Sequence, residues 1–76
     1  MKNTIKEITL IDQIYGSEGM TIRVRVDGKE LKRKVYYNSR DGLYIRIENR
    51  KYFEYDFRLN DTIHLDEYGY VIENEF

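Results

Sequence analysis

Hydrophobic and polar residues alternate along most of this chain with the period of two that is typical of β-strands. The clearest case is the segment IRVRV at residues 22–26, where two arginines separate the apolar positions. Groups rich in Gly, Asn, Asp and Ser interrupt the alternation every eight to twelve residues. The pattern predicts one all-β domain over residues 1–76, a small antiparallel barrel or rolled sheet of six to seven short strands with little or no helix.

The pair Asp27-Gly28 is a sequence signal for a two-residue type I′ turn between two strands. Pairing outward from this turn sets Val24 opposite Leu31 on the inner face and turns the basic residues to the outer face. One pair conflicts with this arrangement, because Ile22 then faces Arg33. A bulge in the strand, or a long arginine stem that carries its charge back to solvent, would resolve the conflict.

A second hairpin is predicted over residues 42–57, with a three-residue loop at 49–51. This loop sets Ile47 opposite Phe53 and Ile45 opposite Tyr55, so that all four residues share the inner face. Opposite charges then pair on the outer face. A shift by one residue would exchange the two faces, so this register decides which aromatic residues are buried.

The two ends of the chain carry weaker patterns. Residues 62–73 predict a hairpin with a four-residue loop at 66–69, which places Ile63, Leu65, Tyr70 and Ile72 on one face. Residues 4–15 combine helical and strand signals, and both interpretations stay open. Six of these twelve residues are β-branched, which favours a strand with a bulge near Leu10-Ile11.

The stretch FRLNDTIHLDEYGYVI, residues 57–72, resembles the corner-then-strand pattern of small SH3-like barrels. The corner in this sequence is Leu59-Asn60-Asp61-Thr62-Ile63. The resemblance implies an SH3-like or OB-like barrel in preference to a sandwich. The expected core comprises Ile8, Leu10, Ile22, Val24, Leu31, Val35, Leu43, Ile45, Ile47, Phe53, Tyr55, Phe57, Ile63 and Ile72.

The net charge of −1 conceals an uneven distribution of charged residues. Residues 20–52 carry ten Lys and Arg against four Asp and Glu, whereas residues 53–76 carry one against seven. Such asymmetry is typical of a nucleic-acid-binding surface followed by an acidic segment. It is equally typical of two parts of one sheet that attract each other, so both interpretations stay open.

Composition also indicates where in the cell the protein is expected to act. The chain has no cysteine, no apolar run of the length of a membrane span, and no apolar segment of a signal peptide near residue 1. We therefore expect a cytoplasmic protein without a membrane partner. The abundance of Ile, Tyr, Lys and Asn, with no Ala, Pro or Trp, is typical of an AT-rich bacterial or phage genome.

The sequence offers little for catalysis. The only serines are Ser17 and Ser39, both in turn segments, and the only histidine is His64. A catalytic triad needs these groups in contact. A zinc site uses three or four ligands, typically His or Cys, and the candidate set of His64, Asp66 and Glu67 contains one such residue. The five glycines stand apart, so there is no phosphate-binding loop. We expect no enzyme activity, metal, cofactor or small-molecule substrate.

Binding is the remaining function, and a basic and aromatic surface is its candidate site. The predicted registers turn seven such residues to one side of the sheet: Arg23, Arg25, Lys32, Lys34, Tyr36, Tyr44 and Arg46. Tyrosine and arginine are enriched at protein–protein contacts, and eight tyrosines in 76 residues is a high count. We expect a non-enzymatic protein-binding module that contacts a partner protein or a second copy of itself. Its small size and composition suggest an accessory or inhibitor protein of a phage or mobile element. The alternative is a nucleic-acid-binding barrel, since lysine and arginine neutralise phosphates and tyrosine stacks on bases.

Overall fold

The computed structural model describes residues 4–16, 18–58 and 60–72 of the chain. They form seven strands and one short 3₁₀-helix: β1 (Glu7–Leu10), β2 (Thr21–Val26), β3 (Lys29–Lys34), β4 (Tyr36–Asn38), β5 (Gly42–Ile47), β6 (Arg50–Phe53), η1 (Glu54–Phe57) and β7 (Thr62–His64). The first sheet has the order β3-β2-β1-β7 and the second has the order β4-β5-β6. All the described strand pairs are antiparallel, so the prediction of an all-β fold class is confirmed.

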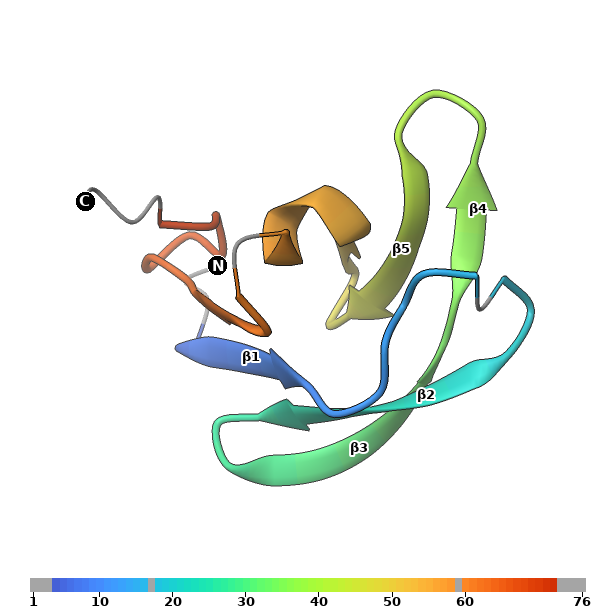
Figure 1. Cartoon of the computed structure of the whole chain (residues 1–76). Helices are drawn as coiled ribbons and strands as arrows, with labels where there is room; N and C mark the ends of the chain where they lie inside the picture. The colour runs from blue at the N-terminus through green and yellow to red at the C-terminus, as the bar shows by residue number, and fades with distance from the viewer. Residues whose placement is uncertain (1–3, 17, 59, 73–76) are drawn as a thin grey trace.

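The two sheets are joined at Val35, the single residue between β3 and β4, whose side chain is fully buried. Beyond this residue the β4–β5 hairpin extends away from the first sheet, and η1 lies between β5 and β1 (Figure 1). The outer strands β6 and β7 are not paired with each other in the described sheets. The two sheets therefore do not close, and the prediction of a closed barrel is not confirmed. The physical reason is η1, which follows β6 directly and contacts β5, β6 and β7 in place of a closing strand.

The β2–β3 hairpin forms as predicted. Asp27 and Gly28 take positive φ angles of 50° and 85°, and the strands pair with Val24 opposite Leu31. The pairing continues without a bulge to Arg33, which lies opposite a buried isoleucine. The guanidinium of Arg33 donates a hydrogen bond of 2.8 Å to an exposed carbonyl, that of Lys32. The long stem of Arg33 therefore resolves the conflict by carrying its charge to the surface.

The predicted register of the next hairpin is wrong. Glu48 and Asn49, with φ angles of 48° and 68°, form a two-residue turn in place of the predicted three-residue loop. Ile45 therefore lies opposite Tyr52, and Phe53 lies opposite Tyr44. Because the register differs by an odd number of residues, every side chain of β6 points to the opposite face from the one predicted.

Two observations explain this register. A type I′ turn matches the twist of the flanking strands, and asparagine tolerates the left-handed conformation that such a turn requires. Tyr52, which is 3% exposed, lies in the core in place of Phe53 and Tyr55, and Phe57 is buried as predicted, from η1. The hydroxyl of Tyr52 donates a 3.1 Å hydrogen bond to the carbonyl of Gly69, so its one polar group is satisfied.

The first strand bears out the predicted strand and bulge. After β1 ends at Leu10, the N–H groups of Ile11 and Asp12 both donate to the carbonyl of Arg23, at 3.1 and 3.3 Å. Two successive residues opposite one partner residue is the pattern of a β-bulge. The bulge turns the chain out of the first sheet and into the loop that leads to β2.

The predicted register of the C-terminal hairpin is wrong by one residue. Leu65 pairs with Val71 and not with Tyr70, so the loop covers residues 66–70 and is one residue longer than predicted. The carboxylate of Asp66 stabilises this loop by accepting the N–H groups of Tyr68 and Tyr70. Tyr70 is consequently exposed. Ile72, which the sequence placed in the core, is 48% exposed.

The buried core lies between the two sheets. It comprises Ile5, Ile8, Ile14, Ile22, Val24, Val35, Ile45, Ile47, Tyr52, Phe57, Ile63 and Leu65. The sequence-based core lacked four of these: Ile5, Ile14, Tyr52 and Leu65. It included Tyr55 wrongly, since that side chain is 48% exposed, whereas Leu10, Leu31 and Leu43 pack at the margin of the core.

Candidate interaction surface

A row of four aromatic side chains crosses the outer face of the second sheet. Tyr36, Tyr44 and Phe53 are cross-strand neighbours on β4, β5 and β6, and Tyr55 continues the row from η1. The ring centroids of successive members are 5.5, 5.2 and 5.2 Å apart. We call these four side chains the aromatic ridge.

The rings of the ridge pack mainly on one another. The first and last pairs are stacked, with interplanar angles of 24° and 4°, and the middle pair is tilted at 51°. Contacts of this kind stabilise a structure by about 0.5–1.5 kcal/mol each beyond the burial of apolar area. Tyr36 is nevertheless 37% exposed and Tyr55 48% exposed, so the ridge presents apolar edges and hydroxyl groups to solvent.

Two titratable groups at the end of the ridge have altered acidity. Burial, with smaller contributions from Asp56 and Asp41, raises the pKa of Tyr55, so its hydroxyl stays protonated and able to donate a hydrogen bond at neutral pH. Burial also raises the pKa of Asp56, while the hydrogen bond from the N–H of Phe53, 2.7 Å long, opposes the shift.

Cationic side chains flank the ridge. The Nζ of Lys34 lies 5.7 Å from the ring centroid of Tyr36, and the Nζ of Lys51 lies 5.2 Å from that of Tyr44. Arg46 lies opposite Lys51 on the same outer face. Within the ranges that the structure describes, none of these three basic groups takes part in an ion pair. Their charge is therefore available to a partner.

The seven residues predicted from sequence all lie on outward-facing positions, but they fall into two groups. Lys34, Tyr36, Tyr44 and Arg46 lie at the ridge, while Arg23, Arg25 and Lys32 lie on the first sheet. The charges of the second group are partly neutralised. Arg23 makes a bidentate ion pair with Asp12, at 2.9 and 3.1 Å, and Arg25 lies opposite Glu30. The ridge therefore carries most of the unneutralised part of the predicted surface.

The ion pair on the first sheet predicts a pH dependence. Hydrogen bonds from the side chain and backbone N–H of Arg23 lower the pKa of Asp12 from 3.8 to about 2. A carboxyl whose pKa is lowered by folding stabilises the native state fully above its unfolded pKa, and this contribution disappears as pH falls through its folded pKa. We therefore expect wild-type protein to lose more stability than Asp12→Asn as pH falls from about 4 to about 2. Urea denaturation at a series of pH values measures the difference, and an NMR titration midpoint for Asp12 at its ordinary value would contradict it.

Three members of the surface were missed by sequence reasoning. Phe53 and Tyr55 were assigned to the core, and Lys51 was assigned to a loop, because the predicted turn at residues 49–51 was one residue too long. The available signal was Asn49, a residue type that adopts positive φ readily and so supports a shorter turn.

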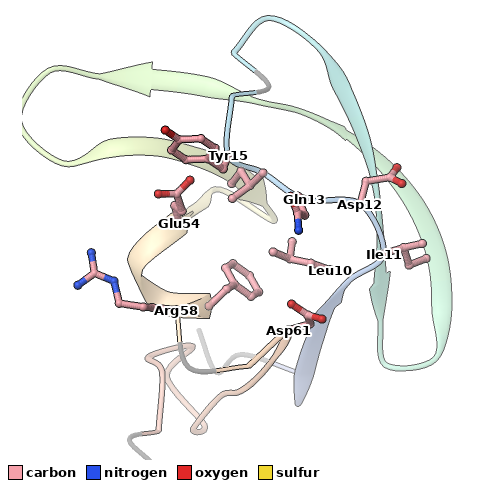
Figure 2. A pocket seen from close by; sticks show the side chains of 10 residues that line it. Leu10, Ile11, Asp12, Gln13, Tyr15, Glu54, Arg58 and Asp61 are labelled. Carbon is pink, nitrogen blue, oxygen red and sulfur yellow. The ribbon is translucent and has the colours of Figure 1, made fainter.

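A separate cavity of about 440 Å³ lies between η1 and the loop that follows β1. Figure 2 shows Glu54 and Tyr15 on one side of it, Leu10 and Asp61 on the other, and the guanidinium of Arg58 directed outward. The Oε2 of Glu54 is buried there without a hydrogen-bond partner among the described residues. None of the residues that line this cavity belongs to the aromatic ridge, so the cavity is a separate site from the ridge.

The described residues include no group of three or more His, Cys, Asp or Glu side chains placed to hold a metal ion. His64 instead lies on the surface, with its Nδ1 3.8 Å from a carboxylate oxygen of Glu7. None of the described segments forms a helix with the length and apolarity needed to span a bilayer.

Comparison with protein-family models, curated proteins and solved structures finds no match to the chain. The geometry of the surface is therefore the basis for a functional proposal.

Proposed function

We propose that this chain is a small, non-catalytic binding module that contacts a partner protein through the aromatic ridge. The observation that carries the proposal is a continuous row of four partly exposed rings, flanked by cations without ion-pair partners among the described residues. A few residues carry most of the binding energy at protein contacts, and tyrosine and arginine are enriched among them. Rigid rings such as tyrosine bury a large area at a small cost in entropy. The strands hold the ridge rigidly, so little order has to be gained on binding.

Nucleic acid is the second candidate, and the cations of the ridge support it. Stacking of unpaired bases, however, requires free ring faces. In the ridge, the rings pack on one another, and Lys34 and Lys51 lie over two of them. A net charge of −1 also gives the whole chain no long-range attraction for a polyanion. The geometry therefore favours a protein partner.

The same proposal extends to the type of fold, the location and the biological role. We infer that the domain is an opened variant of an SH3-like barrel, because β7 returns to pair with β1 as in a sheet that is closing on itself. The cysteine-free composition supports action in the cytoplasm. The small size and the composition support an accessory or inhibitor role encoded by a phage or mobile element.

The proposal is tested by selecting binders from a displayed library of random peptides on the immobilised protein. This selection does not require the sequence of the partner to be known. The matched negative protein is Tyr36→Ser/Tyr44→Ser, which removes two partly exposed rings but no buried residue. Because ring removal at a binding hot spot costs at least about 2 kcal/mol, selected peptides should bind this variant about thirtyfold more weakly. Isothermal titration calorimetry measures the ratio.

A second variant, Arg25→Ser, serves as the control, since it alters an exposed residue of the first sheet and should bind the peptides as the wild type does. Equal binding to the ridge variant and the wild type would contradict the proposal. Titration with single-stranded and double-stranded oligonucleotides tests the second candidate. If the affinity for an oligonucleotide falls steeply with salt and is lost in the ridge variant, the ligand of the ridge is nucleic acid and not a protein.

A further inference from the structure

A groove lies beside the ridge, along the edge of the second sheet. Its volume is about 650 Å³, and it separates β6 and η1 from the C-terminal hairpin. Its lining includes Arg50, Lys51, Phe53, Asp56, Tyr70 and Val71. We call it the β6 groove. Phe53 belongs to both the groove and the ridge, so the two surfaces are continuous.

The groove runs along an unpaired strand edge. β6 is the last strand of the second sheet in the part of the chain that the structure describes. After a two-residue turn, the first pair of residues is hydrogen-bonded, and bonded and non-bonded pairs then alternate. Ile45 and Tyr52 therefore form a bonded pair, whereas Lys51 and Phe53 direct their backbone groups away from β5. The hydrogen bond from the N–H of Phe53 to the Oδ2 of Asp56 is consistent with this direction.

Asp56 satisfies the outward N–H of Phe53, which leaves the N–H and C=O of Lys51 as the unpaired groups of this edge within the described residues. Such a pair of groups is what an added strand uses for its backbone hydrogen bonds. The edge is short, so affinity must also come from side chains. Phe53 with Tyr55 supplies one aromatic wall, and Tyr70 supplies the other, where the guanidinium of Arg50 lies 5.4 Å from its ring centroid.

The charge of the residues that line the β6 groove indicates what binds in it. Arg50 and Lys51 line the groove, and its one acidic lining residue among those described, Asp56, already accepts a hydrogen bond from Phe53. A second copy of the chain fits poorly, because antiparallel pairing of two β6 edges about Lys51 would set two lysines directly opposite each other. An extended segment with acidic residues meets the same edge with complementary charge.

We propose that the β6 groove binds an extended acidic segment of the partner protein, which pairs with Lys51 as an added strand. This inference rests on the proposed function and names the chemistry of the partner. The acidic side chains of the added strand lie on the outer face beside Lys51, and the alternate apolar side chains lie on the other face, towards Tyr70 and Val71. The contact continues onto the ridge through Phe53.

The test uses a capped peptide of alternating glutamate and valine as the probe, with its lysine–valine counterpart as the control. Amide chemical shifts of isotope-labelled protein should change at Lys51 and at Gly69 to Val71 with the acidic probe alone. Two further probes carry N-methyl groups on either the odd or the even residues. Since one edge of an added strand faces β6 and the other faces away from it, one of the two should lose binding and the other should retain it.

Two protein variants complete the design. Lys51→Pro removes the outward N–H, which an edge strand tolerates, and Lys51→Ala removes the charge but keeps the N–H. The proline variant should lose binding beyond the loss seen with alanine. The N-methylated probes remain decisive if the proline variant does not fold.

The outcomes separate this inference from the function on which it rests. Equal binding of both N-methylated probes would overturn strand addition, and dependence of the library peptides on Tyr36 and Tyr44 would still support the ridge. Binding of the lysine–valine control as tightly as the acidic probe would overturn the acidic segment. If the amide chemical shifts of β6 change when the protein concentration is raised without probe, the occupant of the groove is a second copy of the chain and not an acidic segment.

Discussion

Replacement of Tyr52 by alanine is expected to destabilise the domain by about 3–5 kcal/mol, whereas Phe53→Ala is expected to cost about 1–3 kcal/mol. Tyr52 is buried between the sheets, so its removal leaves a cavity and also frees the carbonyl of Gly69 from its hydrogen bond. Phe53 is partly buried and loses two ring contacts on the outer face. Because the two residues are adjacent, the comparison measures directly which face of β6 is inward.

Equilibrium denaturation by urea measures both losses. Tyr52→Phe separates the hydroxyl from the ring and is expected to cost about 1 kcal/mol, the net value of one hydrogen bond. It also supplies a graded measurement if the alanine variant is unfolded in the absence of denaturant, since small domains have only about 5–15 kcal/mol of stability. A larger loss for Phe53→Ala than for Tyr52→Ala would show that the register predicted from sequence is the correct one.

Replacement of Gly69 by alanine is expected to cost about 2–3 kcal/mol. Gly69 has a φ of 87°, where a side chain is strained, and an added Cβ would lie 2.5 Å from the Nε of Arg50. The Arg50 side chain would have to move, which alters its contact with the ring of Tyr70. Both residues line the β6 groove, so the variant also alters one wall of the proposed binding site.

Gly28→Ala is the matched control for this effect. Gly28 has nearly the same φ, 85°, but an added Cβ would meet no atom within 4 Å. Its expected cost is about 1–2 kcal/mol, from backbone strain alone. Thermal and urea denaturation of both variants measures the difference, which isolates the displacement of Arg50. Equal losses would mean that the arginine moves aside without cost.

The accuracy of sequence reasoning differed between the two central hairpins for a physical reason. Asp27-Gly28 is a strong local turn signal, and its register and all the pairs around it were predicted correctly. Glu48-Asn49 carries no glycine, so the sequence did not distinguish a two-residue turn from a three-residue loop. The hydrophobic pattern favoured the three-residue loop, because that register put Phe53 and Tyr55 on the inner face, whereas the observed register sets Arg50 opposite Ile47.

The same difference in register prediction decided which residues of the candidate site were found from sequence. Lys34, Tyr36, Tyr44 and Arg46 belong to strands whose outward face was predicted correctly, so the sequence located one half of the surface. The other half comes from β6 and η1, whose residues had been assigned to the core or to a loop. The pairing of Arg23 with Asp12 across the bulge was also invisible, because it joins segments eleven residues apart that only the fold brings together.

Local chemistry was enough to specify an all-β chain, the positions of most strands and the alternation of their side chains, because each depends on neighbours within a few residues. The face that β6 turns inward depends on distant partners: Tyr52 reaches Gly69, seventeen residues away, and Phe57 enters the core from η1. Competition among these aromatic side chains for one core volume selects the register, and a one-residue difference in turn length exchanges the faces. The aromatic ridge and the β6 groove are the consequence, and they exist only in the folded arrangement of the whole chain.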